Sequence, residues 1–577
     1  MPEVRLGRVF LGWCDHCGLP LLDKECSVCG SHARNIPITP PGDYRLAFPG
    51  ERERLEEIIE DGFGVRPVLG YPLVVNKIPD IDMAREVIWR GCVIGIHKFD
   101  IFRKKEIFLP RICFAQTLID LGTDRYVVAD DGAVDSIKKS SNLLCPGVIN
   151  KGTFEIGDEV IIVDRERKAI ATGSAKVSSS DMPDRGVAIK VRQRERADTL
   201  AGLGYDSFDE CVSKTIEANR NRIESSVAKA KRFIKEVIRE RRLPVACSLS
   251  GGKDSTATLL LLLDAGIKPR LLFTDTGLEF EETVDTVHTT AEKYGLELLE
   301  RKARTDFFDD LEIFGNSSRD YRWCCKTRKM APMAYLINEN FPDGVLTFIG
   351  QRRYESQNRE KHGAVWTNPW LKKQMSASPI QNWNAMEVWL YLFSRGVEYN
   401  PLYGLGFERI GCWLCPASDL YDFELYKHRD YARYMEYLCN RYDEDSIALG
   451  LWRFRRAPRW YEGEIPRRAK RDTILVDEGL CIRFYAPADR VKNMALALGP
   501  GVEVDGSEIR LDDITKREDT RKVIYKARYC AGCGLCESSC DNGAIYIEEN
   551  KAWIDEERCT SCGACLDYLC PAVEYMD

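Results

Sequence analysis

The sequence predicts a multidomain α/β protein built around a doubly wound parallel sheet, with smaller modules before and after it. Its 577 residues are too many for one hydrophobic core. From residue 243 onward, apolar strand-like runs alternate with helical segments, which is typical of a parallel sheet covered on both faces. Most of the 23 cysteines stand in closely spaced sets near both ends and in the middle of the chain. Metal-binding modules are therefore expected at those places.

Composition and charge exclude several classes of protein. A hydrophobic content of 44% and a charged content of 30% describe folded domains rather than disorder. The formal net charge of -7 gives no overall attraction to nucleic acid, so RNA contact requires a local patch. The longest aliphatic run, 259–263, is too short for a bilayer, and the N-terminus lacks a secretion signal. We therefore expect a cytoplasmic protein in a reducing compartment, without a membrane partner.

The first module, residues 1–38, carries two Cys-x-x-Cys pairs that are each followed by glycine. Tetrahedral zinc takes four soft ligands, and two tight turns that each present two sulfurs provide them. Four protein ligands leave no open position for catalysis. The sequence therefore predicts a structural zinc ribbon, with the ligands Cys14, Cys17, Cys26 and Cys29.

Short alternating strands from Glu86 to Val191 predict a small β-barrel over residues 85–195. These residues resemble a PUA domain, and the resemblance implies an RNA partner, with tRNA as the candidate. A barrel kept only for packing is the alternative. Residues 196–242 then form a helical linker, because 224–242 places apolar side chains on one stripe. The PUA resemblance rests on Asp130-Asp131-Gly132-Ala133-Val134, Pro146-Gly147-Val148, Gly157-Asp158-Glu159-Val160 and Ala171-Thr172-Gly173-Ser174-Ala175.

A nucleotide site is predicted where the apolar run 243–249 meets a glycine loop and a helix opening at Thr256. Paired glycines let backbone N–H groups approach a pyrophosphate, and the helix N-terminus adds partial positive charge. The next strand ends at Asp275 and Thr276, where ligands of open α/β sheets bind, so these two are expected to meet a nucleoside. The loop resembles the PP-loop of ATP pyrophosphatases. Its predicted nucleotide-binding residues are Ser248, Ser250, Gly251, Gly252, Lys253, Asp254 and Ser255.

Two further cysteine pairs follow this loop, Cys324-Cys325 and Cys412-Trp413-Leu414-Cys415. Adjacent cysteines do not form a comfortable disulfide, but their thiolates can bind a metal cluster that a distant Cys-x-x-Cys completes. Four thiolates are also what iron–sulfur ligation requires. A structural zinc site on the same four ligands is the alternative.

Residues 243–425 are similar to the phosphoadenosine phosphosulfate (PAPS) reductase family. The similarity rests on Thr274-Asp275-Thr276-Gly277, Cys324-Cys325-Lys326-Thr327-Arg328-Lys329, Gly350-Gln351-Arg352-Arg353 and Arg409-Ile410-Gly411-Cys412-Trp413-Leu414-Cys415-Pro416. It implies an adenine nucleotide alpha hydrolase-like fold, a 4Fe–4S cluster on the central cysteines, and ATP or a sulfonucleotide as ligand, with magnesium as an option. It also implies a catalytic set around the phosphate or sulfate, namely Lys253, Asp254, Arg328, Lys329, Arg352 and Arg353.

Two departures from that family bear on the reaction. The chain keeps a complete ATP-type loop, whereas family members that reduce sulfonucleotides usually have an altered one. The chain also lacks the family's nucleophilic cysteine in a Glu-Cys-Gly setting near the C-terminus. Cys439 and Cys481 follow the central pairs, but their surroundings give no sign of activation. The thiol mechanism of the family is therefore not expected here.

Residues 426–522 are predicted to form a helical, basic segment and a small α/β module over 473–513. Arginines in the segment could follow phosphates while its aromatic rings stack on unpaired bases. A solvated or interdomain charge run is the favoured alternative. The residues concerned are Trp452, Phe454, Trp460, Tyr461, Arg467, Arg468, Lys470 and Arg471.

The tail, residues 523–577, carries the duplicated cysteine pattern of bacterial ferredoxins with two 4Fe–4S clusters. In such proteins the fourth cysteine of each run binds the other cluster. This rule assigns Cys570 to the first cluster and Cys540 to the second. Such a module moves single electrons and implies an external low-potential donor. The first set is Cys530, Cys533, Cys536 and Cys570, and the second is Cys540, Cys559, Cys562 and Cys565.

Three functions are consistent with these features. The first is an iron–sulfur oxidoreductase of the sulfonucleotide reductase type, with three 4Fe–4S clusters and one zinc ion. The second is an ATP-dependent tRNA sulfurtransferase that adenylates a base and inserts sulfur, guided by the PUA domain. The third is a non-catalytic RNA-binding redox sensor. The first is favoured by the family motifs and cysteine sets, and the second by the complete loop and the PUA resemblance.

Overall fold

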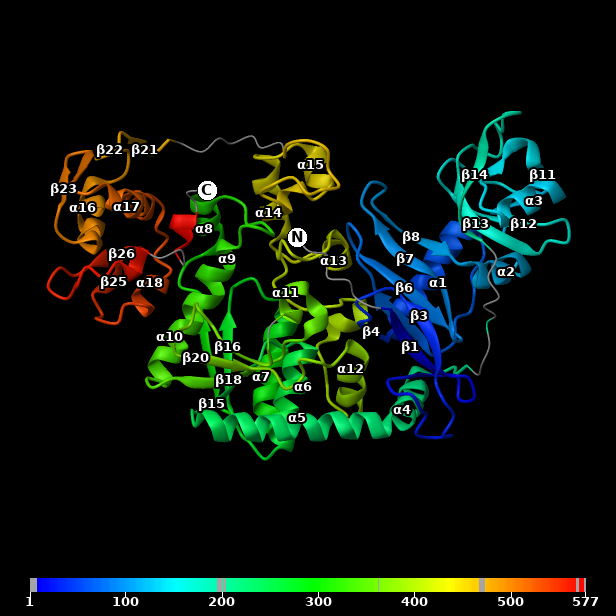
Figure 1. Cartoon of the computed structure of the whole chain (residues 1–577), viewed down its shortest axis with the longest axis horizontal. Helices are drawn as coiled ribbons and strands as arrows, with labels where there is room; N and C mark the ends of the chain where they lie inside the picture. Colours follow the sequence, from blue (N-terminus) through cyan, green and yellow to red (C-terminus); the bar gives the residue numbers. More distant parts are fainter. Residues whose placement is uncertain are drawn as a thin grey trace.

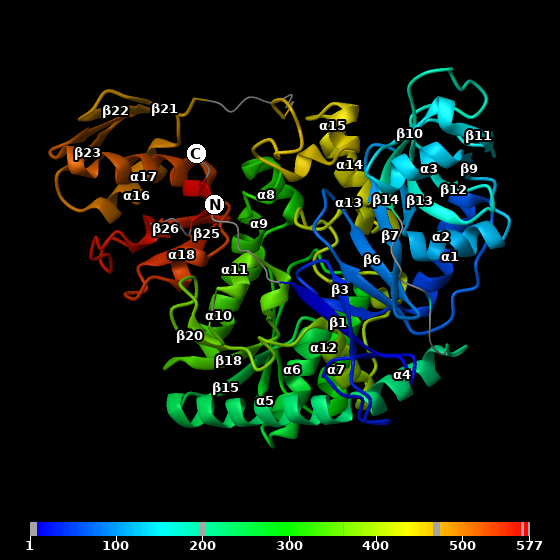
Figure 2. The same cartoon turned by 45° about the vertical axis from the view of Figure 1, so that its right-hand side comes forward.

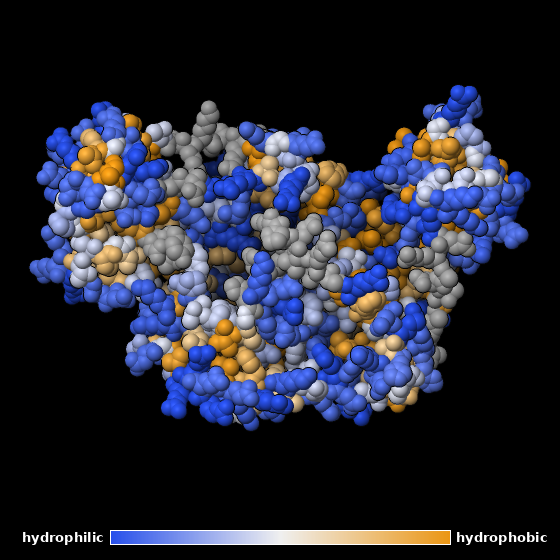
Figure 3. Space-filling view, in the orientation of Figure 1, coloured by the Kyte–Doolittle hydropathy of each residue, from blue (hydrophilic) through white to orange (hydrophobic). Residues whose placement is uncertain are grey.

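The computed structural model describes residues 8–194, 200, 204–361, 363–465, 473–566 and 570–574. The central sheet domain lies at the bottom of Figure 1, with the N-terminal modules to its right and the C-terminal modules to its left. The turned view keeps these two groups on opposite sides (Figure 2). Hydrophilic residues cover most of the face drawn in Figure 3. Within the described ranges, no helix combines the length and apolarity that crossing a bilayer requires.

Two antiparallel sheets form the N-terminal part, in the orders β2-β1-β3 and β4-β5-β6-β7-β8. Leu11 and Trp13 of the first sheet share one apolar core with Leu73 and Val87 of the second. The sheet over residues 43–110 is called the N-terminal sheet module. It packs with the preceding cysteine-bearing module as one N-terminal unit. Its elements are β1 (Val9–Cys14), β2 (Leu19–Leu21), β3 (Arg34–Ile38), β4 (Tyr44–Leu46), α1 (Pro49–Phe63), β5 (Leu73–Lys77), β6 (Ala84–Trp89), β7 (Cys92–Asp100), β8 (Lys105–Pro110) and α2 (Ile112–Asp120).

A third sheet has the order β10-β14-β13-β12-β9-β11 and encloses its own apolar core, which includes Val127, Ile162 and Ile189. The sequence predicts this barrel from residue 85, whereas β6, β7 and β8 belong to the N-terminal sheet module. Alternating apolar residues indicate strands, but they do not say which sheet a strand joins. The elements are β9 (Tyr126–Ala129), α3 (Asp131–Lys138), β10 (Leu143–Leu144), η1 (Cys145–Gly147), β11 (Val148–Lys151), β12 (Glu159–Val163), β13 (Ala169–Ala175) and β14 (Val187–Arg194).

The central domain is a sheet in the order β17-β16-β15-β18-β20-β19, parallel except where β19 joins. Successive residues of its strands face opposite sides: Ala246 and Leu272 pack under α10, while Cys247 and Leu271 pack under α6. The predicted doubly wound sheet is thereby confirmed. The elements are β15 (Val245–Ser248), α6 (Lys253–Asp264), β16 (Arg270–Asp275), α7 (Glu281–Tyr294), β17 (Leu298–Lys302), α8 (Phe307–Phe314), α9 (Trp323–Cys325), η2 (Lys326–Met330), α10 (Ala331–Asn340), β18 (Val345–Ile349), η3 (Arg353–Glu355), α11 (Gln357–Glu360), β19 (Val365–Thr367), β20 (Gln374–Ala377), α12 (Ala385–Ser394) and η4 (Pro401–Leu405).

The linker folds as α4 (Phe208–Ala218) and the long α5 (Arg220–Arg241), which runs along the lower edge of the central domain in Figure 1. Ile234 and Val237 of α5 are buried in the same core as α6. This is the packing that the apolar stripe of 224–242 predicts.

The C-terminal part begins with short helices and continues as a sheet in the order β21-β22-β24-β23 and the hairpin β25-β26. Helix α17 joins the two, because Val523 and Ile524 share a core with Ile482 and Ile545. The elements are α13 (Leu420–Leu425), α14 (Tyr431–Cys439), α15 (Glu444–Ala448), η5 (Leu451–Arg453), β21 (Leu475–Asp477), β22 (Cys481–Phe484), α16 (Ala488–Ala495), η6 (Leu496–Leu498), β23 (Val502–Asp505), β24 (Glu508–Leu511), η7 (Ile514–Lys516), α17 (Arg517–Tyr529), α18 (Leu535–Ser538), β25 (Ile545–Glu548), β26 (Lys551–Ile554), η8 (Ala564–Leu566) and α19 (Pro571–Glu574).

Candidate nucleotide and iron–sulfur sites

The glycine loop spans the gap between the end of β15 at Ser248 and the start of α6 at Lys253. Gly251 has a φ of +67°, and a Cβ there would lie 2.8 Å from the carbonyl oxygen of Thr283. Glycine is therefore required by both conformation and space. The Ser255 hydroxyl lies 3.2 Å from the Ser250 hydroxyl, so the loop closes on itself around its serines.

Lys253 and Asp254 form the charged part of the loop. Nζ of Lys253 donates to Asp254 at 2.8 Å, and Nε of Arg352 lies 2.6 Å from the other carboxylate oxygen. The Lys253 side chain is only 4% exposed. Burial by itself raises the pKa of Asp254, but the charges of Arg352 and Lys253 outweigh it and lower that pKa. The structure thus brings three of the predicted catalytic residues together as ions.

Tyr403 also contacts the loop. Its hydroxyl accepts a hydrogen bond from the backbone N–H of Lys253 at 2.9 Å. That N–H belongs to the first turn of α6, where donors lack a partner within the helix. Tyr403 is buried in the core beneath the loop and stacks edge-on against Trp389. No role for Tyr403 follows from the sequence, although it stands close after the Asn-Pro pair at 400–401.

The carboxyl end of β16 lies beside that of β15, because the two strands are parallel neighbours. Asp275 ends β16 and accepts from the backbone N–H of Gly277 at 2.8 Å. Arg328 is buried and donates from Nε to the carbonyl oxygen of Thr276 at 2.6 Å, while its Nη1 lies 3.3 Å from Asp310. Arg328 therefore holds the strand end in place rather than projecting into solvent.

The central cysteines meet at this same edge of the sheet. Cys324 and Cys325 end α9, directly before a π-helix, a rare element that is frequent at functional sites. Sγ of Cys412 lies 3.6 Å from the Thr276 hydroxyl, and Arg409 donates to Sγ of Cys415 at 3.5 Å. The four central thiols therefore adjoin the residue predicted to meet a nucleoside.

The surroundings shift the pKa values of the central thiols in different directions. Burial raises the pKa of Cys412 well above its usual range, and the hydrogen bond with Cys325 raises that of Cys324. A hydrogen bond from Cys324 lowers the pKa of the Cys325 thiol to about 6; burial opposes this, and the charge of Lys329 adds to it. Burial raises the pKa of Glu279, whose carboxyl oxygen lies 3.9 Å from Sγ of Cys412. The Cys412 thiol donates to that carboxyl oxygen.

Among the described residues, the set of cysteines whose sulfur atoms all lie within 4.8 Å of one another is the N-terminal one. A four-iron cluster binds its thiolates through four different metal atoms, so its ligands need not meet at one ion. The central donor set is compatible with a metal ion or an iron–sulfur cluster.

Comparison with known proteins places these features in families. Residues 244–418 match the phosphoadenosine phosphosulfate reductase domain, and residues 125–194 match the PUA domain. An uncharacterized protein of Methanocaldococcus jannaschii, MJ0066, is 35% identical over 468 residues, which is 78% of this chain and 97% of that protein.

The chain belongs to the PAPS reductase family. The adenosine 5'-phosphosulfate reductase of Geobacillus kaustophilus is 30% identical over 168 residues, or 28% of this chain and 69% of that enzyme. A solved phosphoadenylyl-sulfate reductase from Candida auris aligns with 34% of this chain and 96% of its own, at 20% identity and a TM-score of 0.27. The chain is thus homologous to enzymes of this family over its central domain.

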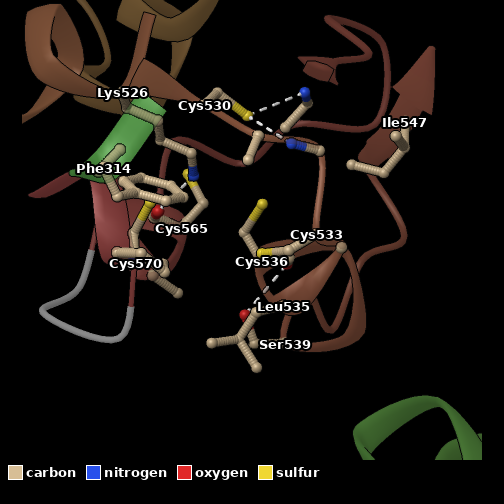
Figure 4. Close-up of a pocket in the computed structure, with 17 residues that line it drawn as sticks. Phe314, Lys526, Cys530, Cys533, Leu535, Cys536, Ser539, Ile547, Cys565 and Cys570 are labelled. Atoms are coloured by element: carbon tan, nitrogen blue, oxygen red, sulfur yellow. Dashed lines mark hydrogen bonds between the residues drawn. The ribbon is translucent and has the colours of Figure 1, made fainter. Parts of the chain in front are cut away.

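The cysteines after the PAPS reductase domain line two cavities. The first is bordered by Cys530, Cys533, Cys536 and Cys570, and Figure 4 shows their side chains around it. The second is bordered by Cys540, Cys559, Cys562 and Cys565, and Cys565 lies between the two. The crossed ferredoxin rule assigns these residues to two ligand sets, and that assignment stays a prediction.

Hydrogen bonds and a buried cation support thiolates at these cavities. Backbone N–H groups of Gly532 and Ala552 donate to Sγ of Cys530 at 3.4 and 3.3 Å. Lys526 is 1% exposed at the first cavity. Burial alone lowers the pKa of Lys526, but the charges of the surrounding cysteines raise it overall. The residues present therefore fit an anionic iron–sulfur cluster, whose potential such hydrogen bonds and charges tune.

Aromatic rings connect the first of these cavities to the central thiols. Phe314 borders the cavity, and its ring centroid lies 5.2 Å from that of Trp323. Trp323 is fully buried and directly precedes Cys324 in the chain. Asn338 on α10 donates to the carbonyl oxygen of Ser538 at 2.8 Å, and Lys326 pairs with Glu574 at 3.1 Å. The tail therefore packs against the central domain, and its first cavity lies beside the segment that carries Cys324.

The N-terminal cysteines converge as the sequence predicts. Sγ of Cys14 lies 3.5 Å from Sγ of Cys29, and Sγ of Cys17 lies 3.9 Å from Sγ of Cys26. All four sulfurs are within 4.8 Å of one another, which suits tetrahedral coordination of a single zinc ion.

The remaining predicted side chains lie apart from the loop network. Lys329 is exposed, and Arg353 is exposed with Glu360 as its partner at 3.3 Å. In the basic and aromatic stretch, Trp452 and Arg453 are buried between modules, which supports the interdomain interpretation for those two. The other predicted basic residues of the stretch lie outside the described residues, namely Arg467, Arg468, Lys470 and Arg471.

Two of the scattered cysteines form a pair that the sequence analysis did not anticipate. Cys92 at the start of β7 and Cys113 in α2 are joined by a disulfide. Neither belongs to a predicted metal set, and their separation of 21 residues carries no recognisable motif.

Proposed function

We propose that the chain is an iron–sulfur oxidoreductase that reduces an adenylylated sulfur compound of the adenylyl sulfate type. The observation that carries this proposal is the 3.6 Å contact between the Thr276 hydroxyl and Sγ of Cys412. A nucleotide bound at the carboxyl ends of β15 and β16 would place its sulfate beside the central thiols. The homology to adenosine 5'-phosphosulfate reductases supports the same substrate class.

In this reaction an electron pair enters the sulfur as the bond between sulfur and the bridging phosphate oxygen breaks. Sulfite and AMP are the products. Lys253 and the loop N–H groups would bind the phosphate, while Lys329, near Cys325 and Glu279, would neutralise the sulfate. Bound iron–sulfur clusters would supply one-electron chemistry. The reaction requires a low-potential external donor and, we propose, a reducing cytoplasm.

The docking of the tail supports electron supply within the chain. A separate thiol carrier is not needed if the ferredoxin-like cavities feed the central site. The contact of Phe314 with Trp323 leaves the first cavity one buried ring pair away from Cys324. The sequence lacks the family's usual nucleophilic cysteine near the C-terminus. Direct electron transfer from the tail to the central site would replace the step that this cysteine performs.

The second candidate is an ATP-dependent tRNA sulfurtransferase. The complete loop, with Ser250 and Ser255 in contact, and the PUA match at 125–194 favour it. Here ATP would transfer its adenylyl group to a base carbonyl oxygen, and pyrophosphate would leave into the loop. A sulfur nucleophile would then displace AMP. A PUA domain has no evident use in reducing a small molecule, whereas an RNA substrate explains it.

Anaerobic calorimetric titration of the iron-loaded protein with ATP, adenylyl sulfate and PAPS separates the candidates. A reductase binds a sulfonucleotide more tightly than ATP and releases sulfite when reduced. Preference for ATP, with AMP formed only in the presence of tRNA, would replace the first proposal by the second. A Lys253→Ala variant with full iron content tests the hypothesis of a non-catalytic redox sensor. A sensor without turnover has no activity that this substitution could remove.

A further inference from the structure

A chain of charged side chains connects the N-terminal sheet module to the loop of the PAPS reductase domain. Asp43, just before β4, lies 2.6 and 3.0 Å from the two Nη atoms of Arg352. Nε of Arg352 lies 2.6 Å from Asp254, which accepts from Nζ of Lys253. Arg352 is 2% exposed, so water screens these charges weakly. Asp43 is therefore coupled electrostatically to Lys253 through two intermediate ions.

A second chain from the same module ends at the same lysine. Arg45 on β4 and Arg85 on β6 each lie 3.0 Å from the Glu408 carboxylate. Glu51 on α1 pairs with both arginines at 2.6 Å. The backbone carbonyl oxygen of Glu408 lies 3.4 Å from Nζ of Lys253. Both chains thus fix groups that contact the ammonium group.

Asp43 has a further bond that sets its position. The carboxylate oxygen that lies 2.6 Å from Arg352 also accepts from the backbone N–H of Ala385, the first residue of α12, at 2.7 Å. Arg352 is shared between Asp43 and Asp254. Without the Asp43 charge, Arg352 would bind Asp254 alone and compete with Lys253 for that carboxylate. The ammonium group would then lose its alignment toward a phosphate.

We propose that the N-terminal sheet module completes the nucleotide site, with Asp43 as a positioning residue that aligns Lys253 through Arg352 and Asp254. Asp43 lies outside residues 244–418, which match the PAPS reductase domain. The inference rests on nucleotide binding by the loop, a step common to both candidate functions. It makes the nucleotide site a composite of two modules.

The test is anaerobic calorimetric titration of the iron-loaded full chain with ATP and with adenylyl sulfate. For whichever nucleotide the unmodified protein binds more tightly, Asp43→Asn is expected to weaken affinity about tenfold, as for a coupled charge network. In a Lys253→Ala background, Asp43→Asn is expected to cause no further loss. Arg352→Lys, which cannot bridge two carboxylates with the same planar geometry, is expected to match Asp43→Asn.

Lys98→Met is the matched control. Lys98 belongs to the same module and pairs with Asp80 at 2.8 Å, and this ion pair shares no residue with either chain of charges. The control substitution is expected to leave nucleotide affinity unchanged. An equal loss from Asp43→Asn in both backgrounds, or no loss at all, would overturn the positioning role while leaving the proposed function intact. An unmodified protein that binds neither nucleotide would overturn both.

Discussion

Buried charges at module interfaces are the residue-scale feature that most distinguishes this chain. Arg453 and Asp82 are both fully buried and 3.1 Å apart. Asp82 also accepts from the backbone N–H groups of Leu420 and Tyr421 at 2.8 and 3.0 Å. A single carboxylate thus neutralises a cation and holds the start of α13. Removal of one partner of such a pair leaves an uncompensated charge in the interior.

Asp82→Asn is expected to destabilise the folded chain by about 3 kcal/mol, because Arg453 would remain buried without its counter-ion. Hydrogen exchange of residues 418–425 should accelerate most, because two of their backbone N–H groups donate to Asp82. The matched control is Asp80→Asn, which removes a pair with Lys98 whose side chains are 27% and 25% exposed, and which is expected to cost less than about 1 kcal/mol. Equal effects of the two substitutions would contradict this account.

Glu106 makes the N-terminal sheet module sensitive to acid. Burial alone raises the pKa of Glu106, but hydrogen bonds from His97 and Arg54 outweigh it and lower that pKa to about 2. A carboxyl with a depressed pKa stabilises the fold above its unfolded value, near 4.5, and this stabilisation is lost as pH falls toward 2. Burial also lowers the pKa of His97, so protonation of this residue disfavours the fold below about pH 6.5.

Glu106→Gln is therefore expected to destabilise the module by about 3 kcal/mol at pH 7, with a difference that shrinks as pH falls from 4.5 toward 2. Hydrogen exchange in β7 and β8, compared between the two proteins at each pH, measures it. The comparison at equal pH removes the contribution of acid-labile clusters. A difference that stays constant from pH 7 to pH 3 would show that the Glu106 charge does not stabilise the module.

At the scale of elements, local signals were sufficient for the nucleotide loop and insufficient for the N-terminal sheet. The strand, glycine loop and helix over 245–264 follow from residues within one short segment, and they form as predicted. The strands of 84–110 were also recognised as strands, yet they join β4 and β5 rather than the PUA sheet. Strand partnership depends on contacts distant in sequence, which alternation of apolar residues does not encode.

Cysteine spacing assigns two ligand sets in the tail through the crossed ligation rule, which is itself a statement about topology. The cysteines of these sets border two cavities, and their assignment as ligands stays a prediction. Substitution of one cysteine from each set tests this rule. Cys540→Ala is expected to remove about four iron atoms per chain and leave the cluster beside Phe314, whereas Cys570→Ala is expected to remove that cluster instead. Iron analysis with electron paramagnetic resonance distinguishes the two losses.

Cys439→Ala is the control for this pair, since Cys439 is exposed and outside the predicted sets. It is expected to keep the full iron content. Identical spectra for the Cys540 and Cys570 variants would mean that the two sets are not separate sites. Loss of the central signal in either variant would mean that the tail cysteines ligate that centre too.

At the scale of the whole molecule, the candidate nucleotide site brings together ion pairs between residues that lie far apart in sequence. Asp43 and Arg352 are separated by 309 positions, and Arg45 and Glu408 by 363. No periodicity or motif in either segment indicates such a pairing. Sequence could locate the loop and the thiols through their own local chemistry, whereas the ions that hold Lys253 appear only in the folded chain.

Hydrogen bonds from side chains and backbone connect the N-terminal cysteine module to the junction of α4 and α5. Asn219 accepts from the backbone N–H of Leu22 at 2.7 Å and donates to the carbonyl oxygen of Pro20 at 2.9 Å. Ser27 N–H donates to the carbonyl oxygen of Ala218 at 2.9 Å. The far end of α5 packs independently, through Ile234 and Val237, against the core beneath α6.

Removal of zinc is therefore expected to loosen the α4–α5 junction without disturbing the nucleotide loop. Structural zinc contributes on the order of 10 kcal/mol to small modules, so Cys26→Ser should unfold residues 14–36. Hydrogen exchange should then rise in 215–223 and stay unchanged in 250–256, with Cys439→Ser as the unaffected control. Faster exchange in the loop would mean that α5 transmits disorder along its length. Unchanged exchange at 215–223 would mean that the Asn219 bonds do not depend on the metal.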